Sequence, residues 1–167
     1  MNNTNADSLE RKKYHELITK IVNLFSVNSI IYDIGKSHKY NYAPIFRNNE
    51  YKSIDNNITK NPDIFLDFEN TEEVIKLPKA DLILCNGVVE QCNNPFKIIE
   101  NCLSLLNDKG YLLFGSVLTG FPVYQNDYFR FTANGLRRMF KNIVTEEIVY
   151  REGITEPTYM YILSRGN

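Results

Sequence analysis

Residues 80–117, "ADLILCNGVVEQCNNPFKIIENCLSLLNDKGYLLFGSV", alternate between two patterns and decide the fold class. Residues 80–86 and 111–117 are short, continuous apolar runs, the pattern of strands that are buried on both faces. Between them, residues 95–107 carry apolar side chains at helical spacing, and Pro95 suits a first helical turn. A strand, a helix and a strand in this order predict a parallel, helix-connected unit.

The remaining segments continue the same alternation on both sides of this unit. Helices are predicted at about residues 8–26 and 133–140, the second capped by Thr132, and strands at 29–34, 51–54, 64–66, 143–150 and 158–164. The last two strands have no helix between them, so we expect them to pair as an antiparallel hairpin. Together these elements predict an α/β, three-layer, doubly wound and mostly parallel sheet with a C-terminal antiparallel hairpin.

The composition is typical of a soluble globular protein. The 167 residues are 43% hydrophobic and 23% charged, enough for a single domain over 1–167, in which the polar residues 1–7 are expected to be disordered. The net charge of −1 gives no field that would attract nucleic acid or a membrane surface. No apolar run reaches the roughly 18 residues of a membrane span, and the first residues lack the apolar core of a signal peptide.

The cysteines and histidines indicate neither a disulfide framework nor a metal site. Cys85, Cys92 and Cys102 are odd in number and show no C-x-x-C spacing, and His15 and His38 are the two histidines. We therefore expect reduced thiols, no bound metal and a cytoplasmic location, with neither nucleic acid nor a membrane as partner.

Candidate binding residues stand where the predicted strands end. In a doubly wound sheet, ligands bind at the carboxyl ends of the strands. Asp55 follows Gly35 by 20 residues, the separation at which an acidic residue accepts from ribose hydroxyls, although Asp55 could also simply cap a strand end. Asp67 could accept from the amine of a base, and Gly87 either permits close backbone approach or forms a turn.

Five segments in order resemble a known family. They are "IIYDIGKSHKY" (30–40), "YKSIDNN" (51–57), "PDIFLDFEN" (62–70), "VVEQCNNP" (88–95) and "NDYFRFTANGL" (126–136). The run is similar to class I S-adenosylmethionine-dependent methyltransferases, and more narrowly to the small methyltransferase-11-type proteins with a "DYxRFT" segment. The resemblance covers about residues 29 to 142. Gln91 stands where the family usually has His.

The resemblance implies S-adenosylmethionine as the cofactor and assigns its contacts. The loop after the first predicted strand would hold the methionine portion of the cofactor, and the end of the second strand would hold the ribose. The end of the third strand would contact the adenine, and the segment after the fourth would lie near the methionine carboxylate and the sulfonium. In that order, the implied cofactor-binding residues are Asp33, Gly35 and Ser37; Asp55 and Asn56; Asp67 and Phe68; and Asn86 and Gly87.

Ser37 departs from the family pattern, because it holds the place of a second glycine. If the loop needs a positive φ there, a side chain would cost about 1 kcal/mol and weaken cofactor binding about tenfold.

We expect the substrate that accepts the methyl group to lie at the segment after the predicted strand at residues 111–117. Its candidates are Tyr124, Asp127, Tyr128 and Arg130. A structural alternative stays open, in which Arg130 pairs with Asp127 and the aromatic rings pack beneath the loop. Glu90 is either a general base or an ordinary helix-surface residue.

These features favour a methyltransferase that acts on a small-molecule or sugar-like acceptor. The alternative is a catalytically silent protein that keeps the fold as a binding or scaffold module. A dinucleotide oxidoreductase fits poorly, since Gly35 is the sole glycine between Asp33 and Asp55 and no G-x-G-x-x-G is present. A homodimer remains open.

Overall fold

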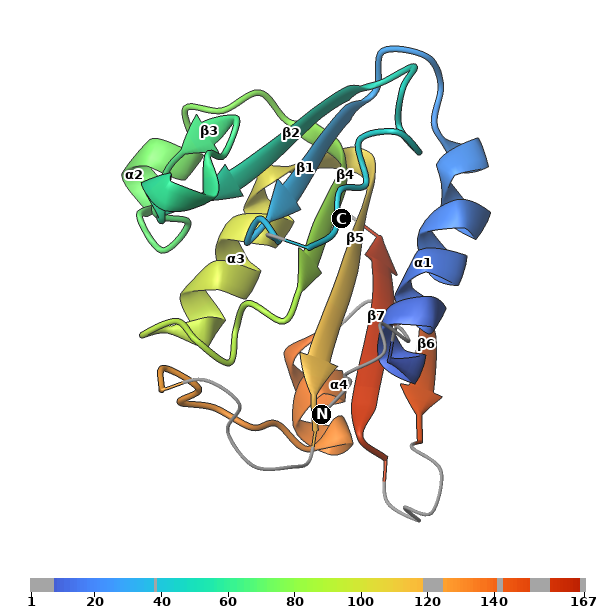
Figure 1. The fold of residues 1–167 in the computed structure, drawn as a ribbon, viewed down its shortest axis with the longest axis vertical. Helices are drawn as coiled ribbons and strands as arrows, with labels where there is room; N and C mark the ends of the chain where they lie inside the picture. The colour runs from blue at the N-terminus through green and yellow to red at the C-terminus, as the bar shows by residue number, and fades with distance from the viewer. Residues whose placement is uncertain (1–7, 38, 119–124, 141–142, 151–156, 166–167) are drawn as a thin grey trace, which may run out of the picture.

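A single seven-stranded sheet organises the chain, with strand order β3-β2-β1-β4-β5-β7-β6 (Figure 1). The computed structural model describes residues 8–37, 39–118, 125–140, 143–150 and 157–165. The strands are β1 (Ile30–Ile34), β2 (Glu50–Asp55), β3 (Ile64–Phe65), β4 (Ala80–Asn86), β5 (Leu106–Val117), β6 (Ile143–Val149) and β7 (Tyr159–Arg165). Strands β1 to β5 pair in parallel, whereas β7 pairs antiparallel with both β5 and β6. The predicted mostly parallel sheet and its C-terminal hairpin are confirmed.

Helices precede and connect these strands. They are α1 (Leu9–Ile21), η1 (Val22–Leu24), η2 (Ile58–Lys60), α2 (Thr71–Val74), α3 (Pro95–Leu105) and α4 (Ala133–Met139). The predicted cap of α4 is confirmed, because Thr132 accepts a hydrogen bond from the Gly135 amide. Helix α1 is capped by Ser8, which accepts from the Arg11 amide. Residues 1–7, for which disorder was predicted, lie outside the described residues.

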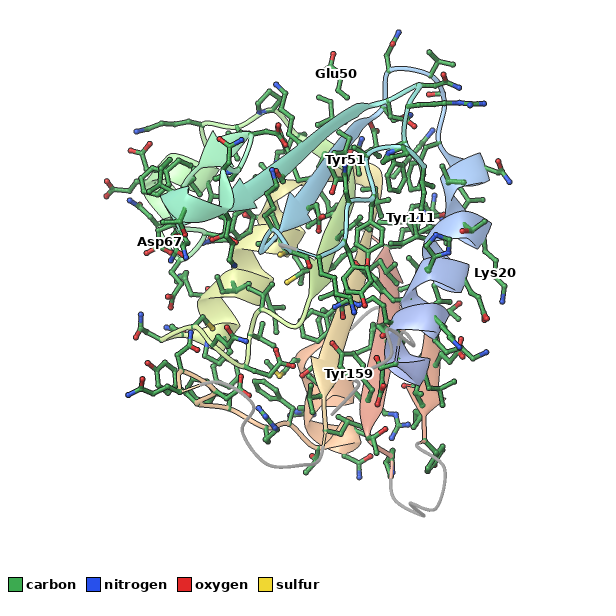
Figure 2. The ribbon with its side chains drawn as sticks, in the orientation of Figure 1. Lys20, Glu50, Tyr51, Asp67, Tyr111 and Tyr159 are labelled. Carbon is green, nitrogen blue, oxygen red and sulfur yellow. The ribbon has the colours of Figure 1, made fainter. Side chains whose placement is uncertain are left out.

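Alternating side chains of the strands build two apolar layers. On β4, Leu82 and Leu84 pack on the side of α1, and Ile83 and Cys85 pack on the side of α2, α3 and α4. Strand β7 alternates in the same way, with Tyr159 facing the α1 side (Figure 2). The result is the expected three layers, with the sheet in the middle. Within the described segments, no helix has the length and apolarity needed to cross a membrane.

The connection from β1 to β2 contains no helix in its described residues, 35–37 and 39–49. Residues 43–48 form turns, and Tyr42 and Phe46 bury their rings against the sheet beside α1. Polar side chains satisfy the backbone locally: Ser37 Oγ accepts from the amides of Lys39 and Tyr40, and Asn41 accepts from the Ala43 amide. Such local bonds compete with a helical ladder, so two aromatic side chains cover the sheet where a helix is usual.

Strand β5 begins earlier than predicted. The turn signal at residues 107–110 lies inside β5, and Pro95–Leu105 is the observed helix. The pairing with β4 shifts between Ala80, opposite Leu106, and Leu82, opposite Tyr111. The sequence Asn-Asp-Lys-Gly therefore forms an irregularity in the ladder, since these four residues of β5 lie opposite the single residue Asp81 of β4 without leaving the sheet.

Candidate functional site

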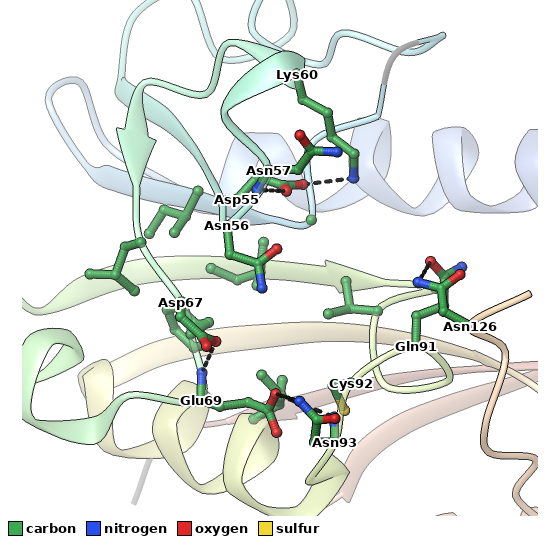
Figure 3. A pocket seen from close by; sticks show the side chains of 18 residues that line it. Asp55, Asn56, Asn57, Lys60, Asp67, Glu69, Gln91, Cys92, Asn93 and Asn126 are labelled. Carbon is green, nitrogen blue, oxygen red and sulfur yellow. Dashed lines mark hydrogen bonds and ion pairs between the residues drawn. The ribbon is translucent and has the colours of Figure 1, made fainter.

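A cavity of about 320 Å³ opens at the carboxyl ends of β1, β2 and β4 (Figure 3). This is the edge of a doubly wound sheet at which ligands bind, and the volume suits a small molecule. Its polar and backbone lining comes from the four connections that follow β1, β2, β3 and β4 and from the segment before α4. The lining residues are Ile34, Gly35, Ile54, Asp55, Asn56, Asn57, Lys60, Leu66, Asp67, Phe68, Glu69, Gly87, Val88, Gln91, Cys92, Asn93, Ile98 and Asn126.

Two glycines form the wall of the cavity beside β1 and β4. Gly35 has φ 81° and Gly87 has φ 68°, a conformation that side chains disfavour. A Cβ on Gly35 would lie 2.5 Å from Val88 Cγ2. The glycine predicted for the first loop is therefore required by both its backbone conformation and its surroundings.

Asp55 ends β2 at the cavity and is 7% exposed. One carboxylate oxygen accepts from the Asn57 amide at 2.8 Å, and the other forms an ion pair with Lys60 Nζ at 2.8 Å. Lys60, on η2, also lines the cavity, and Figure 3 shows its ammonium turned toward Asp55. Asp55 thus carries a fixed charge pair at the strand end.

The opposite wall is built on the loop after β3. The exposed Asp67 accepts from the Glu69 amide at 3.0 Å, and Phe68 buries its ring in the core. The carboxylate of Glu69 accepts from the backbone amides of Asn93 and Asn94, before α3. Glu69 therefore joins two walls of the cavity.

Three predicted cofactor residues, Asp33, Ser37 and Asn86, are not among the residues that line the cavity. The buried Asp33 accepts from Tyr51 OH at 2.5 Å, and Asn86 Oδ1 accepts from Tyr159 OH at 2.6 Å. Burial raises the pKa of Asp33 to about 7, although the bond from Tyr51 opposes the shift. Asp33 and Asn86 thus support the ends of β1 and β4 behind the cavity.

The strain expected at Ser37 is absent. In the described part of the chain, the residues other than glycine with positive φ are Asn28 and Asn61. Ser37 closes a turn with its hydroxyl, which accepts from the amides of Lys39 and Tyr40 at 3.2 Å each. Ser37 therefore lacks the positive φ on which the predicted steric cost depended, and weaker cofactor binding at this loop stays a prediction.

The segment of residues 126–132 lies against the cavity rim through Asn126, whose Nδ2 is 3.4 Å from Gln91 Oε1. Arg130 forms an ion pair with Asp127 at 3.0 Å, as the structural alternative predicted. Tyr128 is 61% exposed. Tyr124, the fourth acceptor-side candidate, lies outside the described residues.

Glu90 anchors this segment. Its backbone oxygen accepts from the amides of Tyr128 and Phe129 at 2.7 and 3.1 Å. Its carboxylate is 2% exposed and accepts from Ser116 Oγ and the Val117 amide at the end of β5. Burial raises the pKa of Glu90, and these bonds oppose the rise. Glu90 is thus not the helix-surface residue that the sequence offered as one alternative, and its role as a general base stays a prediction.

Several lining residues escaped prediction from the sequence. They are Asn57, Lys60, Glu69, Gln91, Cys92, Asn93 and Asn126. The sequence does offer a signal for Lys60: it follows Asp55 by five residues, a spacing at which a short turn can bring the lysine back to the acid. Burial raises the pKa of Cys92 to about 12, so its thiol stays protonated. Among the described residues, no group of three or more His, Cys, Asp or Glu could hold a metal ion.

No protein-family model matches the sequence, and neither does any curated protein. Solved structures do match. The N-methyltransferase NodS from Bradyrhizobium japonicum WM9 is 12% identical with a TM-score of 0.71, over 96% of this chain and 99% of NodS. Its complex with S-adenosyl-l-homocysteine matches with a TM-score of 0.69. The fold is that of the class I S-adenosylmethionine-dependent methyltransferases.

Two further structures show how wide this methyltransferase fold is. TehB from Haemophilus influenzae is 17% identical with a TM-score of 0.70, over 99% of this chain, which spans 64% of TehB. The [4+2]-cyclase SpnF is 13% identical with a TM-score of 0.69, over 99% of this chain and 85% of SpnF. A cyclase among these structures means that the methyltransferase fold alone does not fix the reaction.

Proposed function

We propose that this chain is an S-adenosylmethionine-dependent methyltransferase that acts on a small-molecule or sugar-like acceptor. The observation that carries the proposal is the cavity at the strand ends, where Gly35, Gly87 and the buried Asp55 meet within a methyltransferase fold. S-adenosylmethionine would supply a sulfonium-activated methyl group for in-line transfer, a reaction that depends chiefly on positioning.

The lining residues fit the parts of this cofactor. The two glycines permit close backbone approach at the methionine end. Each oxygen of Asp55 accepts one bond within the protein and retains a lone pair for a ribose hydroxyl, while Lys60 holds the carboxylate in place. Asp67 would accept from the adenine amine.

The acceptor would approach past the segment of residues 126–132. Tyr128 projects into solvent there, and the Asp127–Arg130 pair fixes the backbone around it. A general base is needed only if the acceptor must lose a proton, so the buried position of Glu90 does not oppose this activity. The free thiols of Cys85, Cys92 and Cys102 support a reducing, cytoplasmic location.

Isothermal titration with S-adenosylhomocysteine tests cofactor binding. We expect the wild-type protein to bind and Asp55→Asn to bind about 10- to 100-fold more weakly, because the substitution removes a charged acceptor. Glu72→Gln, which removes a charge from an exposed position on α2, is the matched control and should bind like wild type. Absence of binding at millimolar ligand would refute the proposal.

A catalytically silent binding or scaffold protein is the second candidate, because the fold alone does not fix an activity, as its occurrence in a cyclase illustrates. Incubation with methyl-labelled S-adenosylmethionine and a small-molecule extract separates the two. Label transferred by wild type and lost in Asp55→Asn indicates a methyltransferase. Cofactor binding without transfer to any extract component indicates the silent alternative.

A further inference from the structure

A second cavity, of about 370 Å³, lies between α1 and the connection from β1 to β2. Its lining shares no residue with the cavity at the strand ends. One side of α1 contributes charged and polar side chains, and the connection contributes two aromatic rings. The lining residues are Arg11, Lys12, His15, Glu16, Tyr40 and Tyr42.

Arg11 is held rigidly in this cavity. Its guanidinium carbon lies 4.1 Å from the ring centroid of Tyr40, and its Nη1 donates to Tyr42 OH at 2.9 Å. Tyr42 is 5% exposed, and burial raises its pKa, so it stays a neutral phenol. The orientation of the guanidinium is therefore set by two aromatic side chains that carry no compensating charge.

The charge balance of the cavity is positive. Arg11 has no carboxylate partner within ion-pair distance among the described residues. The acid in the lining, Glu16, pairs with Lys13 at 3.1 Å. Arg11 and Lys12 thus face the cavity, and neither pairs with the acid of its lining. The charge of Arg11 does act on Asp33, outside the lining, where it opposes the rise in the pKa of that buried carboxyl.

We propose that this second cavity binds a small anionic molecule, an organic carboxylate or a phosphate ester, through Arg11. A guanidinium presents a planar set of five donors that matches carboxylate and phosphate oxygens, and Tyr42 occupies one donor group. A partly buried cation is stabilised by an opposite charge. The ring of Tyr40 supplies a flat apolar wall for the body of the molecule.

Titration with three probes that share one aromatic ring tests the site: 4-hydroxybenzoate, phenyl phosphate and the neutral benzamide. We expect wild type to bind at least one anion and to bind benzamide at least about tenfold more weakly. The anion that binds more tightly identifies the carboxylate or the phosphate ester as the natural class.

Arg11→Met should weaken anion binding about 10- to 100-fold, and Arg11→Lys should lie between, because it keeps the charge and loses the planar fork. The matched control is Lys20→Met, which removes a charge of α1 that points into solvent (Figure 2). Lys20→Met should bind the anion like wild type. Unfolding curves of each variant show that the fold is intact.

Three results would overturn the proposal. They are no anion binding at about 10 mM probe, equal binding by wild type and Arg11→Met, and displacement of the bound anion by S-adenosylhomocysteine. The last result would make the cavity part of the cofactor site. Because the probes are not cofactor analogues, anion binding can succeed even where cofactor binding fails.

Discussion

The chain leaves the neighbouring strands β1 and β4 through two glycine turns that line the same cavity, but the turns differ. Gly35 and Gly87 both have positive φ. A Cβ on Gly35 would clash with Val88, whereas on Gly87 the nearest atom, Tyr159 OH, would be 3.6 Å away. Glycine is therefore required by conformation at both turns and by space only at Gly35.

The strand ends before the two turns also differ in charge. Asp33 is a buried acid whose pKa is raised to about 7, with Tyr51 as hydrogen-bond donor. Asn86 is a neutral amide that accepts from Tyr159. The two turns therefore share a positive φ, but an ionisable side chain precedes the first and a neutral one precedes the second. We expect the stability of only the first strand end, at Asp33, to change with pH.

Asp33→Asn should have the largest effect, on the pH dependence of unfolding. The folded pKa is raised above the unfolded value of 3.8, so the contribution of Asp33 is fully present below about pH 4 and is lost as pH rises through about 7. Wild type should lose up to about 4 kcal/mol over this interval from this group.

Urea unfolding between pH 4 and 8 measures this loss. Asp33→Asn keeps an acceptor for Tyr51 and should flatten the plot of unfolding free energy against pH. A smaller dependence on pH should remain from Glu90, whose pKa is also raised. Parallel curves for wild type and variant would show that Asp33 is not the titrating group.

Gly35→Ala and Gly87→Ala should rank the two turns. Gly35→Ala should destabilise by about 3 kcal/mol, from positive φ and from the clash with Val88. Gly87→Ala should cost about 1 kcal/mol, from φ alone. Denaturant midpoints measure both, and equal losses would contradict the distinction. Adding Val88→Ala should recover part of the stability lost in Gly35→Ala and none of that lost in Gly87→Ala.

Ser37→Gly should have the smallest effect. The hydroxyl of Ser37 accepts from two amides and the residue has no positive φ, so glycine removes a turn contact and relieves no strain. We expect destabilisation of about 0.5–1 kcal/mol and no gain in affinity for S-adenosylhomocysteine. A tenfold gain in titration would restore the idea of a weakened glycine loop.

Local patterns in the sequence predicted the elements well. The strand at residues 80–86 has the predicted bounds, because a buried parallel strand needs a continuous apolar run, and Thr132 caps α4 as its side chain predicts. The irregularity inside β5 was missed, because its Asn-Asp-Lys-Gly sequence also suits a turn and only the pairing with β4 decides.

The site was predicted at the strand ends and missed in its contacts. Gly35, Asp55 and Asp67 could be placed because strand ends converge at one sheet edge. The bond from Tyr159 to Asn86 joins residues 73 apart, and that from Glu69 to Asn94 joins residues 25 apart. No local spacing indicates such pairs. Which of the predicted residues bind a cofactor stays a prediction.

The packing of α1 against β7 sets the order in which the chain can fold during synthesis. Tyr161 OH donates to the Glu10 backbone oxygen at 2.5 Å, across 151 residues, and the ring of Tyr161 stacks on that of Tyr14. Helix α1 emerges from the ribosome early but lacks this partner until β7 has been made. The α1 layer of the core must therefore close after nearly all of these residues are synthesised, which leaves apolar strand surface exposed to chaperones in the interval.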